Sequence, residues 1–512
     1  MTTRLRALAA VAAAVLLVGC VPEKTQVSPE DSATPSTGGT ASPGNTQGID
    51  VYEQDVEWSQ CGELDCATVQ VPLDWSEPDG ATISVAINRY PARDQDARIG
   101  SLLINPGGPG ASGLDYTEVL AASAGDELVD AYDIVGFDPR GVGESTAIAC
   151  GTSAQIDEYF LPDRPITSQA DIDEWDRLNA EFAELCQAGS GRVAENVDTA
   201  SVAKDMDVLR AILGDDKLHY LGFSYGTQLG ATYAELFPEN VGRLVLDGAV
   251  DFLLPGDEVG AQQAEGFESA LTAFLQWCTG KEECALGNDV EQARTTIQDL
   301  LDTAKAEPYY TGTNLDLNGN LMIYGIVVTL YDEGSWDYLE QGLAEVIEQS
   351  TGGILLFLAN FYLDRSDSTG EYLSNSQVAF TAINCLDADT SDVMDLADYQ
   401  ETKALMEEAS PTFGWWFASS TGCQNWPWTA DVHITSLDQA ATAGDNILVI
   451  GTTNDPATPY AWAQSLSERL GSTLLTYEGE GHTAYGRSNQ CIIDAVDGFL
   501  VGGQMPDSGT EC

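Results

Sequence analysis

The chain has 512 residues, 43% of them hydrophobic, and carries 81 acidic side chains against 21 Lys and Arg, so its formal net charge at pH 7 is −60. This length and apolar content suit a large buried core and exclude a chain that is disordered throughout. The charge excludes the basic surface that binds nucleic acid and opposes contact with anionic lipid headgroups. We expect a globular protein whose acidic surface is mostly solvated.

The first 50 residues read as an export signal followed by a tether. Two arginines precede an apolar run over residues 7–18, and the run ends shortly before Cys20. It is too short to span a bilayer and is typical of a secretory signal peptide, with an ending that resembles a bacterial lipobox. We predict a signal peptide over residues 1–19, a lipid on Cys20, and a flexible linker over residues 20–50. Ordinary signal cleavage and an uncleaved anchor are the alternatives.

The cysteine content agrees with an exported protein. Of the eleven cysteines, ten remain when Cys20 is set aside, an even number that can persist as disulfides outside the cell. Connectivity cannot be derived from sequence. Closeness along the chain suggests Cys61–Cys66, Cys278–Cys284 and Cys491–Cys512, which leaves Cys150–Cys186 and Cys385–Cys423 for the longer loops. A metal site is the poorer alternative, because no C-x-x-C pair occurs and only three histidines exist. We expect the protein at the outer face of the cytoplasmic membrane or in the cell envelope, lipid-anchored or later shed.

From residue 51 onward, short apolar strands alternate with helices, as a mostly parallel sheet requires. The spacing predicts an amphipathic helix over residues 201–213. Strands are predicted over residues 83–89, 101–104, 132–137 and 217–221. The alternation indicates an α/β fold.

The most informative motif is Gly222-Phe223-Ser224-Tyr225-Gly226, which reads G-x-S-x-G between a predicted strand and a predicted helix over residues 227–237. A serine between two glycines at a sharp strand-to-helix turn is how an α/β-hydrolase exposes its nucleophile. The pentapeptide alone is common by chance, so the rest of the chain has to support it. We predict that Ser224 is the nucleophile.

Two loops upstream of the serine are rich in turn-forming residues. Acyl transfer places negative charge on the carbonyl oxygen, which needs two backbone N–H donors. In this fold one donor follows the nucleophile, here Tyr225, and the other lies in a glycine-rich loop after an early strand, here Gly108. A plain turn is the alternative for that loop. The second loop, residues 138–145, we interpret as structural, with an Asp and an Arg that pin it beside the active site.

The base is selected by chain order, which runs serine, acid, histidine in α/β-hydrolases. His219 precedes the serine, and His433 lies in a stretch without a clear pattern. His482 follows a predicted strand over residues 472–477, so a loop presents it at the carboxyl end of that strand. We predict His482 as the general base.

The acid is expected in the loop after the preceding strand, which is predicted over residues 447–451. Asp455 lies in that loop, whereas Asp445 precedes the strand and belongs to the opposite edge of the sheet. We predict that Asp455 orients the imidazole. Thr458 is interpreted as a structural hydroxyl in the same loop.

Between residues 251 and about 430 the alternation stops and the pattern becomes helical. An insertion between the nucleophile half and the acid–base half is where this fold carries a cap. We therefore predict a first core part over residues 51–250, a helical cap over 251–430, and a second core part over 431–512. The fold class is an α/β-hydrolase with a mostly parallel central sheet.

The full set of motifs resembles the secreted tripeptidyl aminopeptidases of actinobacteria, within the proline iminopeptidase-like serine peptidases. The resemblance extends from about residue 57 to residue 512 and includes a C-terminal segment typical of that family. Its motifs are the loops at 105–110 and 138–145, the elbow at 222–226, the segment 382–387, and the loops of Asp455 and His482. One loop departs from the simplest members: Pro106-Gly107-Gly108-Pro109 replaces His-Gly-Gly-Pro, so proline specificity does not transfer.

The resemblance implies an exopeptidase that releases short peptides, tripeptides in the first place, from free N-termini through an acyl-enzyme. The expected substrates are peptide or protein N-termini. The triad mechanism needs no metal or organic cofactor, and we expect a monomer. An aminopeptidase also needs carboxylates for the substrate ammonium group. The candidates are Asp387, Glu265 and Glu268, with a surface charge or a structural hydrogen bond as the alternative for each.

Two other functions fit the same motifs. A carboxylesterase or lipase would use the same triad, although the acidic exterior and the lack of an obvious apolar lid helix speak against lipid interfaces. A non-catalytic binding protein on a hydrolase fold is the third possibility, and the filled triad positions disfavour it.

The net charge of −60 leads to a first prediction, about stability. Repulsion among the acidic side chains destabilises the compact state, and added salt screens it. We expect the melting temperature to rise between low and molar NaCl, measured by differential scanning calorimetry. A melting temperature that stays flat or falls would contradict this expectation.

Overall fold

A computed structural model describes residues 50–388 and 394–512 of the chain. The predicted signal peptide, Cys20 and the linker up to residue 49 lie outside the described residues. Within the described ranges, none of the helices has the length and apolar character needed to cross a bilayer.

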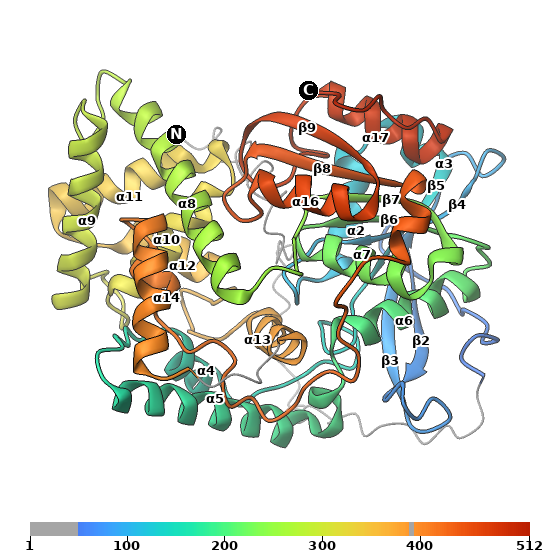
Figure 1. The fold of residues 1–512 in the computed structure, drawn as a ribbon, viewed down its shortest axis with the longest axis horizontal. Coiled ribbons are helices and arrows are strands. Elements are labelled where there is room, and N and C mark those ends of the chain that lie inside the picture. The colour runs from blue at the N-terminus through green and yellow to red at the C-terminus, as the bar shows by residue number, and fades with distance from the viewer. Residues whose placement is uncertain (1–49, 389–393) are drawn as a thin grey trace, which may run out of the picture.

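A nine-stranded sheet forms the centre of the core, in the order β1-β2-β3-β5-β4-β6-β7-β8-β9 (Figure 1). The strands from β5 to β9 in this order run parallel to one another, and β1, β2 and β3 are antiparallel to their neighbours. The strands are β1 (Ser59–Cys61), β2 (Leu64–Pro72), β3 (Thr82–Tyr90), β4 (Gly100–Asn105), β5 (Tyr132–Phe137), β6 (Leu218–Phe223), β7 (Val241–Asp247), β8 (Ile447–Asn454) and β9 (Thr473–Glu480).

Helices cover both faces of this sheet, because its inner strands are apolar on both sides. In β4, Leu103 packs into one hydrophobic cluster while Leu102 and Ile104 pack into the other, as the two-residue period of a strand requires. One face carries α6 (Thr199–Ile212), α7 (Tyr225–Leu236) and α16 (Tyr460–Leu470), and the other carries α2 (Gly113–Ser123), α3 (Asp126–Ala131) and α17 (Gln490–Gly502).

The predicted strands are present, with ends that differ by a few residues, and the α/β-hydrolase class is confirmed. Strands β1, β2 and β7 were not predicted from the sequence. β1 has only three residues, β2 is interrupted by polar residues, and in β7 Gly242 and Arg243 precede the apolar run at the partly exposed end. None of these three strands has an uninterrupted apolar run as long as residues 447–450 of β8.

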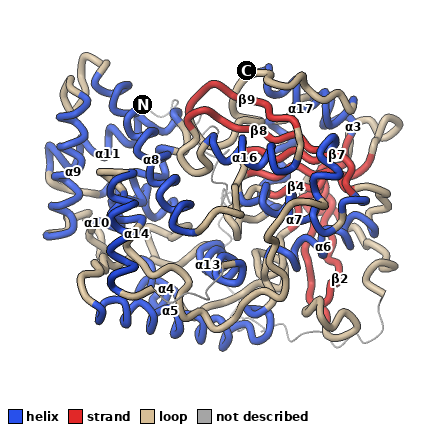
Figure 2. The backbone as a smooth tube through the Cα atoms, viewed as in Figure 1, coloured by secondary structure: helices blue, strands red, loops and turns tan. Residues whose placement is uncertain are grey.

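A helical lobe follows β7 and forms the cap, at the left in Figures 1 and 2. It has a hydrophobic core of its own, to which α8, α9, α10, α11 and α12 contribute. The cap helices are α8 (Gly256–Thr279), α9 (Val290–Ala306), α10 (Gly319–Leu330), α11 (Trp336–Gln349), α12 (Gly353–Tyr362), α14 (Leu396–Ala409) and α15 (Gly414–Phe417).

The cap is supported by two helices that precede it in the chain, α4 (Ser153–Phe160) and α5 (Gln169–Ser190), which lie along the lower edge of Figure 1. The Asp163 carboxylate, in the loop between them, accepts the N–H groups of Gly319 and Asn320 at 3.0 and 2.7 Å. These are the first residues of α10, whose N-terminus favours an anion. The first part of the chain therefore holds the cap as well as the sheet.

Helix α13 (Ser376–Asp387) lies between the two lobes in Figure 1, although the sequence analysis placed it in the cap. Its apolar face packs into the hydrophobic cluster of the core and not into that of the cap. That face consists of Val378, Ala379, Ala382, Ile383 and Leu386. We therefore treat α13 as a bridge between cap and core.

Five disulfides join the cysteines in the expected pairs within the described residues. Cys385–Cys423 ties α13 to the segment that returns to the core, and Cys491–Cys512 ties the C-terminus to α17. The C-terminal segment also pairs with β9, since the Cys512 N–H donates to the Thr476 carbonyl at 2.8 Å.

Candidate active site

Ser224 sits at the turn between β6 and α7, with φ 55° and ψ −123°. This left-handed backbone is rare for a residue with a side chain and marks a strained turn. The flanking glycines make the turn possible. A Cβ on Gly222 would lie 2.4 Å from the Gly226 carbonyl oxygen, and one on Gly226 would lie 2.7 Å from that of Asn105. The Ser224 hydroxyl has no hydrogen bond within the described part of the chain, so it is free to turn.

The glycine-rich loop after β4 lies directly against this elbow. A Cβ on Gly107 would be 2.9 Å from the Ser224 Cβ and 3.3 Å from the Tyr225 nitrogen. Among the described residues, neither the Gly108 N–H nor the Tyr225 N–H has a hydrogen-bond acceptor. Unpaired backbone donors beside a serine are what an oxyanion site requires.

Asp455 and His482, predicted as acid and base, are brought together and buried. The His482 Nδ1 lies 2.9 Å from Asp455 Oδ1 and 3.0 Å from Oδ2. The carboxylate also accepts the N–H groups of Ala457 and Thr458 and the Thr458 hydroxyl. Because an ionised carboxylate can only accept, His482 carries its proton on Nδ1, which leaves Nε2 as the base.

Asp247, at the end of β7, connects the elbow to the histidine loop. Its backbone carbonyl accepts the Ser224 N–H at 2.9 Å. Its carboxylate accepts the Ala484 N–H at 3.0 Å and the Tyr485 N–H at 2.7 Å. Burial raises the pKa of Asp247 to about 6, although the two N–H groups oppose that shift. One fully buried residue thus fixes the nucleophile and the two residues that follow Thr483 in the base loop.

The cap also holds the histidine loop, through Tyr331 at the end of α10. The His482 N–H donates to the Tyr331 carbonyl at 2.9 Å. The Tyr331 ring meets the imidazole edge to face, with the ring centres 5.4 Å apart. On the other side, Arg487 donates to the carbonyls of Glu480 and Thr483. The base is therefore positioned from core and cap together.

A second cap contact fixes the acid loop. A Cβ on Gly266 in α8 would lie 2.6 Å from the Pro456 carbonyl oxygen. Gln263, one turn earlier, donates through Nε2 to the Ala457 carbonyl at 2.8 Å. The Ser269 hydroxyl bonds the Asn454 side chain at 2.6 Å. Helix α8 thus packs on the loop that carries Asp455.

Aromatic side chains of the cap form a continuous cluster that begins at His482. Tyr331 contacts Phe267 and Tyr362. Tyr362 stacks on Tyr324, with ring centres 5.2 Å apart. Phe413, Trp416 and Phe417 extend the cluster, since Phe413 and Phe417 contact Phe267 and Trp416 contacts Tyr324. His482 therefore contacts this aromatic cluster of the cap through Tyr331.

Asp387, a candidate for binding the substrate ammonium group, makes its contacts inside the protein. Its carboxylate accepts the Thr199 N–H at 3.0 Å and the Thr199 hydroxyl, which also lies 2.6 Å from the Tyr225 hydroxyl. Burial raises the pKa of Asp387 to about 7. The residue links α13 to the start of α6 and to the residue after the nucleophile, because its partners occupy both carboxylate oxygens. A role for Asp387 as an ammonium ligand stays a prediction.

Glu268 is also engaged in structural contacts. It pairs with Arg294 and accepts the Ser410 hydroxyl and the Thr412 N–H, so it ties α8 to α9 and to the segment before α15. These contacts give Glu268 a structural role, and its role as an ammonium ligand stays a prediction. Glu265 is exposed, with no hydrogen bond or ion pair in the described residues, and its role stays a prediction.

The loop of residues 138–145, which was predicted to be structural, makes structural contacts. Arg140 is fully buried and pairs with Asp205 through two hydrogen bonds of 2.6 and 2.7 Å. Asp138 accepts the Ser112 hydroxyl at 2.6 Å and the Glu144 N–H at 2.8 Å. His219, which was not selected as the base, lies in β6, and its Nδ1 is 3.2 Å from the hydroxyl of Tyr132 in β5.

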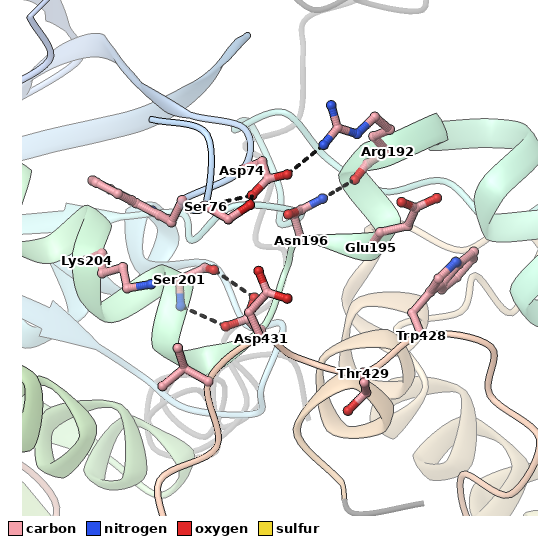
Figure 3. A pocket seen from close by; sticks show the side chains of 13 residues that line it. Asp74, Ser76, Arg192, Glu195, Asn196, Ser201, Lys204, Trp428, Thr429 and Asp431 are labelled. Atoms are coloured by element: carbon pink, nitrogen blue, oxygen red, sulfur yellow. Dashed lines mark hydrogen bonds and ion pairs between the residues drawn. The ribbon is translucent and has the colours of Figure 1, made fainter. Parts of the chain in front are cut away.

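A polar pocket of about 280 Å³ lies elsewhere on the core, near the start of α6 (Figure 3). Arg192 and Lys204 line it together with Trp428 and Asp431. Arg192 is paired with Asp74 at 2.6 Å. None of Ser224, Asp455 and His482 lines this pocket, so it is separate from the candidate active site.

Comparison with known proteins places these features in a family. Residues 410–512 match the family model described as TAP-like protein. The chain is 35% identical to "Serine protease Hip1" of Mycobacterium tuberculosis over 486 residues, which covers 90% of this chain and 91% of that protein. It is 36% identical to "Carboxylesterase B" of the same organism over 502 residues, covering 94% and 95%. It is 31% identical to "Tripeptidyl aminopeptidase" of Streptomyces lividans over 479 residues, covering 91% and 86%.

The chain belongs to the tripeptidyl aminopeptidase-like family of α/β-hydrolases. It is therefore a serine hydrolase, as the sequence motifs predicted. The relatives carry both peptidase and esterase names, so the family alone leaves the substrate class open.

Sequence reasoning missed two residues that position the triad, Asp247 and Tyr331. Asp247 could have been found as the polar residue that ends the apolar run Leu244-Val245-Leu246 at the same sheet edge as the elbow. Tyr331 had no such signal, because its contact with His482 runs through a backbone carbonyl of a distant helix.

The Asp247 contacts generate a second prediction. In Asp247→Asn the side-chain NH₂ group can face the N–H groups of Ala484 and Tyr485, and the charge that attracts them is gone. Hydrogen bonds to a charged group are worth about 1.5–3 kcal/mol, so we expect kcat/KM to fall by about 10- to 100-fold. The measurement is steady-state hydrolysis of a chromogenic substrate at pH 8.

Asp251→Asn is the matched control, because Asp251 is also buried, lies four residues further along and contacts Arg469 instead of the histidine loop. We expect this control to keep kcat/KM within about twofold of wild type. Equal losses in the two variants would contradict a positioning role for Asp247.

Proposed function

We propose that the protein is an exported serine exopeptidase that releases short peptides, tripeptides in the first place, from free N-termini. Ser224 is the nucleophile, His482 the general base and Asp455 the residue that orients the imidazole. The N–H groups of Tyr225 and Gly108 bind the oxyanion. The substrates are peptide or protein N-termini.

The reaction follows from these assignments. His482 Nε2 removes the Ser224 hydroxyl proton while Oγ attacks the scissile carbonyl carbon, and Asp455 stabilises the imidazolium. The two N–H groups stabilise the negative charge on the carbonyl oxygen. His482 then protonates the leaving amine, the C–N bond breaks, and an acyl-enzyme remains. Water, deprotonated by His482, attacks the acyl-enzyme and releases the short peptide.

The observation that carries the exopeptidase proposal is the packing of the cap and of α13 on the base, acid and oxyanion loops beside Ser224. Tyr331 contacts the base loop, Gly266 contacts the acid loop, and α13 packs on the oxyanion loop, where a Cβ on Gly110 would lie 2.6 Å from the Ser376 carbonyl oxygen. A continuous polypeptide needs an open groove to reach a serine in its middle. A site covered on these sides favours chain ends.

The proposed location is the outer face of the cytoplasmic membrane or the cell envelope. The apolar run that ends at Cys20 supports export and lipid attachment. The five disulfides support an oxidising compartment. We propose that the protein acts there as a monomer, anchored through the lipid or shed from it.

A carboxylesterase is the second candidate, because a relative with 36% identity carries that name. The same Ser224, His482 and Asp455 would cleave an ester. The difference lies in whether the site recognises a peptide N-terminus.

The third prediction separates these functions. Tripeptide p-nitroanilides with a free N-terminus should be hydrolysed, whereas the same peptides with an acetylated N-terminus should react at least about 10-fold more slowly in kcat/KM, because a lost charge-assisted contact removes more than 1.4 kcal/mol. Short p-nitrophenyl esters are assayed beside them. In Ser224→Ala, hydrolysis of every substrate should fall by at least about 10³-fold.

Three outcomes would contradict parts of this account. Ester cleavage without peptide cleavage would support the carboxylesterase. Equal hydrolysis of free and acetylated peptides would remove the exopeptidase assignment. Full activity in Ser224→Ala would remove the nucleophile assignment.

A further inference from the structure

Asp364, in the segment after α12, is a buried carboxylate with an unsatisfied oxygen. Asp364 is 6% exposed, and its Oδ2 has no hydrogen-bond partner among the described residues. Its backbone is left-handed, with φ 52°. Burying an unpaired carboxylate is unfavourable unless a positive group or a donor completes it. The residue therefore points to a ligand that supplies one.

Asp364 is coupled electrostatically to Asp115, an exposed carboxylate. Besides burial, the Asp115 carboxylate raises the pKa of Asp364, and the Glu144 carboxylate raises that of Asp115. In the described part of the chain none of these three acids takes part in an ion pair. Arg365, the neighbouring cation, is bound instead to Asp157 at 2.8 Å. The Ser374 hydroxyl and N–H stabilise Asp364 in part, but they leave the cluster without a positive charge.

The three acids come from segments that meet at the oxyanion loop. Asp115 lies in the first turn of α2, directly after that loop. Glu144 follows Gly143, whose N–H donates to the Asn375 side chain at 3.0 Å. Asn375 caps α13, which packs against Gly110. The acid cluster thus borders the loop that contains Gly108.

A second chain of contacts leads from Asp364 to the base. Tyr362 precedes it by two residues and lies against Tyr331, with ring centres 6.4 Å apart. Tyr331 in turn contacts His482, with the two ring centres 5.4 Å apart. Asp364 therefore lies between the aromatic cluster over the base and the loop beside the nucleophile.

Exposed apolar side chains surround the same segments. Leu373, whose N–H donates to the Asp364 carbonyl at 2.9 Å, is 65% exposed. Phe361 and Phe380 are also among the large apolar residues that remain exposed in the described structure. A ligand that carries both a cation and apolar groups matches this surface, as the N-terminus of a peptide does.

We propose that Asp364, supported by Asp115 and Glu144, binds the α-ammonium group of the substrate and so determines that a free N-terminus is required. The proposal rests on the exopeptidase function proposed above. A tripeptide spans at most about 10 Å, so an ammonium site at a fixed distance from Ser224 selects the length of the released peptide as well as its charge. The proposal gives to the acids of this cluster the role for which Asp387, Glu265 and Glu268 were the candidates from the sequence.

The test uses the full-length exported enzyme and the isosteric variant Asp364→Asn. We expect kcat/KM for a free-amine tripeptide p-nitroanilide to fall at least about 10-fold, mainly through KM, because a charge-assisted contact is lost. Hydrolysis of the acetylated tripeptide and of p-nitrophenyl acetate should stay within about twofold, since neither carries the ammonium group. Asp115→Asn should show the same selectivity with a smaller loss.

Glu118→Gln is the matched control, because Glu118 is an exposed acid one turn after Asp115 on α2 and has no partner in the described residues. It removes one charge from the same helix and should leave all three substrates unchanged. A general effect of net charge on substrate attraction would appear in this variant too, and would overturn the assignment to Asp364.

The remaining outcomes separate this inference from the function on which it rests. If wild type prefers the free amine and Asp364→Asn and Asp115→Asn keep that preference, the ammonium site lies elsewhere and the inference is wrong. If both variants lose activity equally on all substrates, the cluster is structural and the inference is also wrong. If wild type itself shows no preference for the free amine, the exopeptidase function fails first. Should Asp364→Asn not fold, as judged by circular dichroism, Asp115→Asn alone decides the question.

Discussion

The arrangement of the active site depends on the buried Asp247 at the end of β7. Its carbonyl holds the Ser224 N–H and its carboxylate holds the N–H groups of Ala484 and Tyr485, so one residue sets the nucleophile against the base loop. Burial raises the pKa of the Asp247 carboxyl group, and the N–H groups of Ala484 and Tyr485 oppose that rise. Three segments distant in the sequence are thereby fixed to one point of a rigid sheet.

The cap also positions the acid and the base. Tyr331 holds the backbone of His482, and α8 packs through Gly266 on the loop of Asp455. In this arrangement the cap helps to align the acid and the base. Helix α13 joins the two roles, since its start borders the oxyanion loop and its last residue, Asp387, binds Thr199 beside Tyr225.

The sequence was sufficient for the parts of the site that follow local rules. The elbow at Ser224 and the positions of Asp455 and His482 after apolar strands depend on turn chemistry and chain order, which are written in short segments. The substrate acids are different, because a carboxylate is free or engaged according to its partners. The sequence does not show that Glu268 pairs with Arg294. It also does not indicate Asp364, because the burial of this residue and its missing partner are properties of the folded chain.

The central claim is that this geometry makes Ser224 the one activated serine of the protein. Its most direct measurement is reaction of the active enzyme with a fluorophosphonate, followed by mass spectrometry of the labelled peptides. We expect one phosphonyl group per chain, located on Ser224, with a labelling rate that parallels the loss of hydrolysis. Complete loss of hydrolysis with the label on another residue, or with Ser224 unlabelled, would contradict the account.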